Sequence, residues 1–430
     1  MAIIPQRQLF SWQEIEDLGD LDRLILVLEY MPDEVLMQLL EHLRGLGRDD
    51  YPIRGMWNAV LAGVVYQHCS AESLLRELRR NGQLRAVCGL NKVPTSSAFS
   101  RFLSKLLEME AEVTEIFEAL VKELIELLSD FGENLGIDGK AIPTHAKAHK
   151  ESKPDDGRRD NDADYGVKTY RGKSEDGTKW EKTKSWFGYN LHLIVDTNYE
   201  LPVAFSVTKA SAAEAPEAHR LLGQLEQSEP ALLKRCKYFT ADRGYDDSKL
   251  IVGLRDHHNI KPVIDIRNMW KDGDKTRLVS GQANVVYDYC GNVFCYCPKE
   301  GHMRQMALGG FEQDRQTLKY RCPACHYGIS CAGKAQCPVG KAIRIPLKED
   351  PRIFTPVARS SYKWKELYKM RTATERVNSR LDVSFGFEEH FIRGQKKMQL
   401  RAGLALCVML AMAVGRIKEK QPEKMRSLVA

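Results

Sequence analysis

Three acidic residues stand in settings that would bring their carboxylates together from distant parts of the chain. Asp138 and Asp242 each follow a short apolar run, at residues 135–137 and 238–241, and Glu375 lies far downstream in a basic segment. Two divalent ions roughly 3.5–4 Å apart can activate the attacking oxygen and stabilise the leaving oxygen of a phosphodiester. Mg²⁺ and Mn²⁺ prefer such hard oxygen ligands. We therefore interpret the three carboxylates as catalytic metal ligands.

Each carboxylate also has a purely structural interpretation. Asp138 precedes Gly139 and could end a strand in a turn, and Asp242 precedes an Arg-Gly pair that could do the same. Thr372 and Glu375 satisfy the Ser/Thr-x-x-Glu pattern of a helix capping box. Taken singly, none of the three indicates catalysis; the joint pattern favours it.

Four segments, taken in order, resemble the DDE transposases of bacterial insertion sequences. They are residues 135–143, 184–196, 240–246 and 368–381, and the resemblance covers most of the chain. It implies an α/β fold with a ribonuclease H-like mixed-sheet core. It also implies an enzyme that binds the ends of its own insertion sequence and uses two Mg²⁺ or Mn²⁺ ions for strand cleavage and strand transfer. The partners would be double-stranded element ends and target DNA, bound by a homodimer.

The last of these segments departs from the family at one position. In many such transposases a Tyr, an Arg, a Glu and a Lys follow in fixed spacing; Tyr368, Arg371 and Glu375 match, but Asp382 replaces the lysine. The resemblance implies that Arg371 contacts a phosphate beside the metals and that Tyr368 positions DNA or the arginine. Asp382 could repel phosphate, add an acidic group near the metals, or simply face solvent. The first option predicts that Asp382→Lys strengthens DNA binding.

Positive charge is concentrated around Glu375. Residues 359–401 hold eleven Lys and Arg against five Asp and Glu, which accounts for the whole net charge of +6. A phosphate backbone requires such a surface, whereas the structural alternative is a solvated helix face. The expected DNA-binding residues are Tyr368, Arg371, Arg376, Arg380, Lys396 and Lys397.

The composition is that of an ordinary globular chain. Of 430 residues, 43% are hydrophobic and 28% charged, which is typical of neither a disordered nor a membrane protein. The longest apolar run, residues 404–414, is far shorter than the roughly twenty residues that cross a bilayer, so we expect a buried helix. The N-terminus lacks the pattern of a signal peptide, and we expect a cytoplasmic protein.

Periodicity divides the chain into regions. Residues 1–130 repeat leucines at three- and four-residue intervals, which predicts a helical domain. Thr95 follows Pro94 at an expected helix start, which could open the second helix of a DNA-reading pair or cap an ordinary bundle. The resemblance favours a DNA-end-binding domain here.

Beyond residue 130 the period changes to that of strands. We expect strands at 135–142, 187–196, 201–207, 238–242 and 261–266, with helices at 215–225 and 247–257. Residues 147–184 are polar and glycine-containing, which predicts a surface loop. The first part of the catalytic core would span 131–266, and its C-terminal part, with the helix of Glu375, would span 362–430.

The intervening insertion, residues 267–361, holds seven of the eleven cysteines. Reduced cysteines in such numbers favour a metal site, and Cys322 and Cys325 form a zinc half-site that Cys295 and Cys297 could complete. Cys331 and Cys337 compete for the same role, and a set of unliganded thiols is the alternative. The cysteines expected in the core are Cys69, Cys88, Cys236 and Cys407.

Three further side chains have two interpretations. His192 could face the metals, but a core histidine is favoured; Trp186 and Tyr245 could stack on a displaced base, but core packing is favoured. Two other functions remain open: a metal-dependent nuclease that never joins strands, and a DNA-binding regulator. An intact carboxylate triad argues against the regulator.

Overall fold

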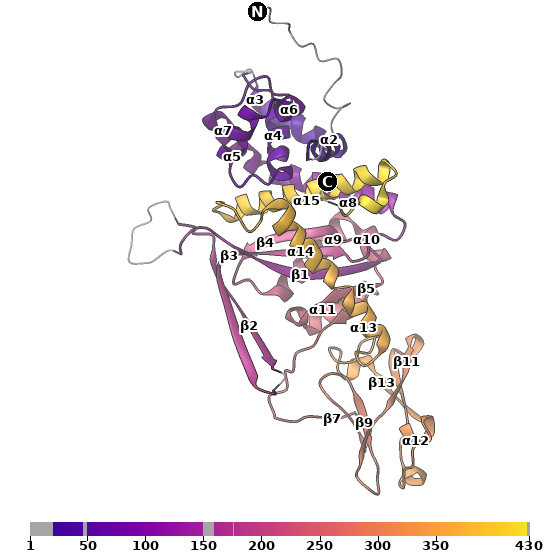
Figure 1. Cartoon of the computed structure of the whole chain (residues 1–430). Helices are drawn as coiled ribbons and strands as arrows, with labels where there is room; N and C mark the ends of the chain where they lie inside the picture. Colours follow the sequence, from indigo (N-terminus) through magenta and orange to yellow (C-terminus); the bar gives the residue numbers. More distant parts are fainter. Residues whose placement is uncertain (1–19, 46–49, 149–158, 175, 428–430) are drawn as a thin grey trace, which may run out of the picture.

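The computed structural model describes residues 20–45, 50–148, 159–174 and 176–427. It shows a mixed α/β protein in which N-terminal helices lie at one end and a cysteine-rich insertion at the other (Figure 1). The N-terminal helices are α2 (Asp20–Tyr30), α3 (Glu34–Arg44), α4 (Ile53–Val65), α5 (Ala71–Arg80), α6 (Gly82–Val87), α7 (Ser96–Glu108) and α8 (Glu110–Leu127). The Thr95 side chain caps α7 by accepting a hydrogen bond from the Ala98 amide.

A six-stranded sheet lies between these two ends. Its strands are β1 (Asn134–Pro143), β2 (Asp164–Lys173), β3 (Lys179–Asp196), β4 (Leu201–Lys209), β5 (Tyr238–Ala241) and β6 (Lys261–Ile264). The order is β2-β3-β1-β5-β6, with β4 also paired to β3. β1 is antiparallel to β3 and parallel to β5. The helices between these strands are α9 (Glu214–Ser228), α10 (Pro230–Arg235) and α11 (Ser248–Val252), which runs into a π turn (Gly253–His257).

The predicted surface loop at residues 147–184 is wrong at 164–173 and 179–184, which form strands, while residues 149–158 and 175 lie outside the part of the chain that the structure describes. β2 pairs with the first half of β3 as an antiparallel ribbon, in register from Asp164 with Gly188 to Lys173 with Lys179. This ribbon projects from the sheet (Figure 1), and its β3 side chains from Lys179 to Ser185 are exposed. Both faces of this strand pair are exposed to solvent, so its sequence does not alternate between apolar and polar residues. Such a sequence resembles that of a loop.

The C-terminal helices close the fold. They are α13 (Tyr362–Lys369), α14 (Thr372–Phe385), α15 (Gln395–Lys418) and a 3₁₀ turn, η6 (Pro422–Lys424). α14 packs on β1 and β3, whereas α15 packs against α2, α4, α8 and β4. By length and composition α15 could cross a membrane, but 78% of its most apolar stretch is buried inside the protein. The apolar run at 404–414 is therefore a buried core helix, as expected.

The insertion has a hydrophobic core of its own. Its sheets contain β7 (Arg277–Leu278), β8 (Val285–Tyr287), β9 (Val293–Tyr296) and β10 (Met303–Gln305), and β11 (Ala307–Glu312), β12 (Thr317–Arg321) and β13 (Ala342–Pro346). Its helical pieces are η3 (Gln313–Arg315), α12 (Pro323–His326), η4 (Lys334–Gln336) and η5 (Leu347–Glu349). Arg352, in the insertion, pairs with the buried Asp246 of the main sheet's β5–α11 connection, so the two parts are joined by a buried ion pair.

Candidate active site

Adjacent strands place two of the predicted carboxylates. β1 and β5 run parallel, with Ile137 paired to Ala241, so the next residue of each chain segment is Asp138 or Asp242. β1 continues through Pro143, so Asp138 does not end a strand in a turn. Asp242 does end β5, and its carboxylate caps the following 3₁₀ turn, η1 (Arg243–Tyr245), by accepting a hydrogen bond from the Gly244 amide at 2.7 Å.

Asp138 sits at the contact between β1 and α14. Its Oδ1 accepts a hydrogen bond from the Gly139 amide at 2.9 Å, and its Oδ2 lies 3.5 Å from Asn378 Nδ2 and 4.0 Å from Arg371 Nη1. Burial, and then the neighbouring Asp242 carboxylate, raise the pKa of Asp138 to about 6, although Arg371 opposes the shift. A buried carboxylate beside another carboxylate is a site that favours a bound cation.

Glu375 is held close to the same place by an arginine. Its Oε1 accepts a hydrogen bond from Arg371 Nη2 at 2.6 Å, while the other end of that guanidinium faces Asp138. The capping-box alternative does not form, since the α14 N-cap is Arg371 and carries no side-chain cap, and the Thr372 hydroxyl donates to the Lys369 carbonyl. Arg371 thus joins the third carboxylate to the first.

The three predicted catalytic carboxylates lie in the same region of the protein, but they are not positioned to share a metal ion. Among the residues that the structure describes, no three His, Cys, Asp or Glu side chains converge closely enough to hold a metal ion. Cations of the protein stand among the carboxylates instead: Arg371 beside Asp138 and Glu375, and Lys168 beside Glu214 and near both aspartates. The hard oxygen donors fit Mg²⁺ or Mn²⁺, provided that these side chains rearrange.

Several residues of this site were not predicted from the sequence. Asn378 lies three residues after Glu375, so helical spacing alone could have placed it on the same face. Lys168 lies on β2, inside the stretch misread as a loop, and its partner Glu214 begins α9. Nothing in the sequence indicates that Lys168 and Glu214 pair, because their contact depends on where the β2–β3 ribbon lies relative to α9.

The predicted DNA-binding residues fall into three groups. Tyr368 stacks on Trp364 with ring centroids 4.6 Å apart, and Arg371 lies over the Tyr368 ring, so these two stand at the carboxylates. Arg376 and Arg380 point elsewhere: both bind Glu200, a buried residue at the β3–β4 turn, and so fasten α14 to the sheet. Their contact with DNA stays a prediction, and it would compete with this pairing.

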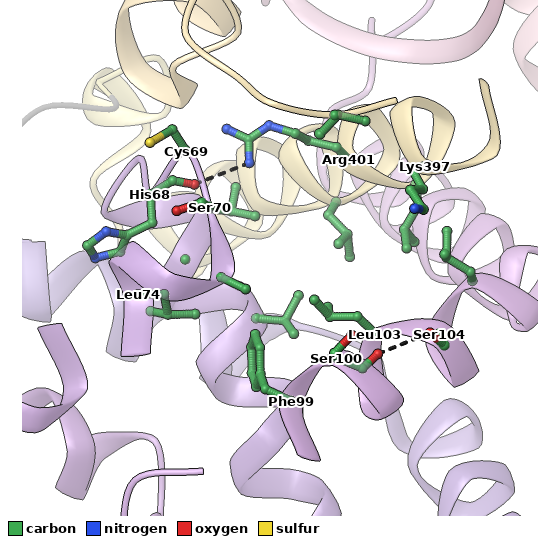
Figure 2. A pocket seen from close by; sticks show the side chains of 18 residues that line it. His68, Cys69, Ser70, Leu74, Phe99, Ser100, Leu103, Ser104, Lys397 and Arg401 are labelled. Carbon is green, nitrogen blue, oxygen red and sulfur yellow. Dashed lines mark hydrogen bonds between the residues drawn. The ribbon is translucent and has the colours of Figure 1, made fainter. Parts of the chain in front are cut away.

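Lys396 and Lys397 open α15 and are both exposed. Lys397 lines a cavity of about 310 Å³ between α4, α5, α7 and α15 (Figure 2). Arg401 borders the same cavity and donates hydrogen bonds to the Phe385 and His68 carbonyls. None of the three predicted catalytic carboxylates lines this cavity.

Asp382 does not face solvent. Its carboxylate forms an ion pair with Lys140, which lies two residues after Asp138 on β1, and both side chains are largely buried. The interpretation of Asp382 as a solvent-facing residue is wrong.

The three ambiguous aromatic and histidine residues are all buried, as the favoured alternative expected. Trp186 donates its indole N–H to the Tyr189 carbonyl, and Tyr245 is fully buried. His192 is also fully buried, with Nε2 3.0 Å from the Thr208 hydroxyl, and burial lowers its pKa to about 4.

The cysteines of the insertion gather differently from the predicted zinc set. A cavity of about 20 Å³, which is room for one water-sized species, is lined by Cys295, Cys297, Cys322, Cys331 and Cys337. Cys325 is exposed instead, with its sulfur 3.8 Å from the Gly340 carbonyl oxygen. Cys295, Cys297 and Cys322 thus stay together, but Cys331 and Cys337 replace Cys325 around the cavity.

Comparison with known proteins identifies the class. A family model described as a transposase DDE domain matches residues 135–411, well over half of the chain, and one described as a transposase domain matches residues 11–105. The chain belongs to the DDE-domain transposases and is an enzyme of that class.

Two further comparisons add little. A search of curated proteins finds no match. The solved structure of a piggyBac transposase synaptic complex with hairpin DNA is similar over 97% of this chain and 80% of that chain, with 11% sequence identity and a TM-score of 0.37. A likeness at this level assigns no residue and no partner to the chain.

Proposed function

We propose that this transposase binds the ends of its own insertion sequence and catalyses metal-dependent strand cleavage followed by strand transfer, on a ribonuclease H-like core. The observation that carries the proposal is the placement of Asp138 and Asp242 on the adjacent strands β1 and β5, with Glu375 on the helix that packs against β1. Arg371 links Glu375 to Asp138, and Asp242 raises the pKa of Asp138. Their spread along the chain argues against a local structural role.

In this mechanism the carboxylates would hold Mg²⁺ or Mn²⁺. When bound, the two ions supply activation of the attacking oxygen and stabilisation of the leaving oxygen. Asn378 and the Gly139 amide orient Asp138, and the Gly244 amide orients Asp242 through its Oδ1. Arg371 positions Glu375 and, with Tyr368, lies where the phosphate next to the reacting bond would pass.

The remaining parts of the chain would handle DNA. We assign residues 1–130 to end binding, 131–266 and 362–430 to the catalytic core, and 267–361 to a separate insertion. Two element ends must be held together for transfer, so the active form would be a homodimer on double-stranded element ends and target DNA. Lys396 and Lys397, exposed at the start of α15, would add backbone contacts.

The experiment that tests the proposal separates a transposase from a nuclease. The full chain would be incubated with DNA carrying the ends of its element, a target plasmid and Mg²⁺, and the products mapped. We expect 3′ hydroxyl ends and joined products in which those ends are linked to target strands. Cleavage without joining would support the nuclease, and binding without cleavage would overturn the assignment.

A change at Asp382 tests where the positive charge beside the site acts. Because Asp382 neutralises Lys140, Asp382→Asn frees an ammonium two residues from Asp138. We expect tighter binding to element ends and a salt dependence steeper by about one phosphate contact. Asp382→Lys should act in the same direction, but at a cost in stability, because two partly buried ammonium groups would meet. A salt series that leaves affinity and slope unchanged would mean that Lys140 does not reach DNA.

The cysteine-lined cavity supports a zinc site with corrected ligands. We expect about one zinc per chain, held by four of the five cavity cysteines after their sulfurs close around the ion. Cys322→Ser should release the zinc and loosen the insertion, whereas Cys325→Ser should retain it, because Cys325 is exposed and does not line the cavity. Metal analysis of protein purified without chelator decides: no zinc, or equal loss from both variants, contradicts this ligand set.

A further inference from the structure

A fourth carboxylate lies close to Asp242. Glu214 is the first residue of α9, and its Oε2 presses on Gly244, where an added Cβ would stand 1.7 Å from it. The same Cβ position is 2.8 Å from Asp242 Oδ1. The two carboxylate oxygens are therefore no more than 4.5 Å apart, the sum of these distances. A side chain at position 244 would require the Glu214 carboxylate to move away.

Like charges at this spacing need a cation, and Lys168 supplies one in this structure. Its ammonium lies 2.9 Å from Glu214 Oε1 and also interacts with Asp138 and Asp242. Lys168 comes from β2, in the ribbon that projects from the sheet, and it is the only lysine paired with these carboxylates in the part of the chain that the structure describes. The Lys168 ammonium is thus placed to interact with three carboxylates, those of Glu214, Asp138 and Asp242.

Polar atoms left without partners point to the same place. A Cβ atom added to Gly139 would stand 3.3 Å from Glu214 Oε1, 3.5 Å from the Tyr245 hydroxyl and 3.6 Å from His192 Nδ1, so these three polar atoms converge beside Gly139. Tyr245 and His192 are fully buried, and within the described residues neither of these two atoms has a hydrogen-bond partner. Buried polar atoms normally have a partner, so the two unpartnered atoms beside the Glu214 carboxylate distinguish this group of acidic residues from an ordinary acidic cluster.

We propose that Glu214 is a fourth acidic ligand of the divalent-metal site. In the metal-free protein the Lys168 ammonium occupies the position of the metal, and it withdraws when the metal binds. This inference rests on the proposed function, because it takes Asp138 and Asp242 as metal ligands. Lys168 withdraws by a change of its side-chain conformation, and the unpartnered Tyr245 hydroxyl and His192 nitrogen remain beside the Glu214 carboxylate.

Manganese binding to the full chain without DNA tests the proposal. Calorimetric titration with MnCl₂ would compare wild type with Glu214→Gln, Lys168→Gln, Asp138→Asn and a control, Glu217→Gln. Glu217 lies one turn further along α9, is as buried as Glu214, and binds the Ser206 hydroxyl and Arg220 instead of the site. Thermal unfolding with and without MnCl₂ gives a second readout, because a ligand that binds only the folded state raises its stability.

We expect Glu214→Gln to weaken Mn²⁺ binding by roughly 10–100-fold, as the loss of groups around a metal usually does. Lys168→Gln should tighten it by about threefold to tenfold, because a competing charge is removed, and no folding defect can produce this gain. Glu217→Gln should bind as wild type does.

The outcomes separate the inference from the proposed function. If Asp138→Asn loses Mn²⁺ binding while Glu214→Gln keeps it, Glu214 is not a ligand and only the inference fails. If Asp138→Asn also binds normally, the metal site itself is misassigned. If Lys168→Gln binds more weakly than wild type, Lys168 supports the site and does not compete with the metal.

Discussion

Asp138→Asn, Asp242→Asn and Glu375→Gln should each reduce cleavage of element ends by roughly three orders of magnitude or more while end binding stays close to wild type. The reason is that each change removes a metal ligand and leaves the DNA-contacting surface in place. Because the three act as one unit, combining two changes should cost little more than either alone. Cleavage and gel-shift assays on the same labelled ends measure both properties.

A matched control keeps this test specific. Glu366 on α13 pairs with Lys369 one turn away, much as Glu375 pairs with Arg371, but lies outside the carboxylate group. Glu366→Gln should therefore cleave normally. If a triad variant cuts at the wild-type rate, that residue does not belong to the catalytic site. If a variant no longer binds the element ends, its loss of cleavage does not show that the residue is catalytic.

Arg352→Met should destabilise the protein by about 3–5 kcal/mol, because it leaves the Asp246 carboxylate buried without its partner. Arg352 Nη1 lies 2.8 Å from Asp246 Oδ2 and also donates to the Arg267 carbonyl at 2.9 Å. This pair joins the insertion to the turn that follows Asp242. The midpoint of urea unfolding measures the effect.

An exposed ion pair within the insertion provides the comparison. Arg344 on β13 binds Glu312 at 2.7 Å, with both side chains open to solvent, so Arg344→Met should shift the midpoint of urea unfolding far less than Arg352→Met does. Replacing both members of the buried pair, Arg352→Met with Asp246→Leu, should recover much of the loss. Equal effects of Arg352→Met and Arg344→Met would show that the Arg352 pair does not hold the insertion in place.

The strands that carry Asp138 and Asp242 could be predicted because each is a buried apolar run ended by turn residues. Helix α15 could also be predicted from its apolar residues, because a helix that is buried on all sides needs apolar side chains around its whole circumference. The β2–β3 ribbon could not, because its exposed faces carry no apolar alternation. Local patterning therefore reveals only those elements that are partly buried.

Contacts between distant residues set the remaining limits. Lys140 and Asp382 are 242 residues apart, and nothing in either segment indicates that they pair. Arg376 and Arg380 look like a DNA-facing pair in the sequence, but Glu200 binds both. Likewise, the Cys322–Cys325 spacing suggests two ligands, yet α12 directs only Cys322 to the cavity. Residue type and spacing select candidates, and packing decides which of them meet.

The most direct test of the triad is a structure of the full chain bound to an end of its element with Mn²⁺, in which the metal is located by its anomalous scattering. We predict manganese density contacted by Asp138, Asp242 and Glu375, with Arg371 released from Glu375 or turned toward a phosphate. Carboxylates that stay more than about 10 Å apart on DNA, or manganese bound elsewhere, would contradict two-metal catalysis by these residues.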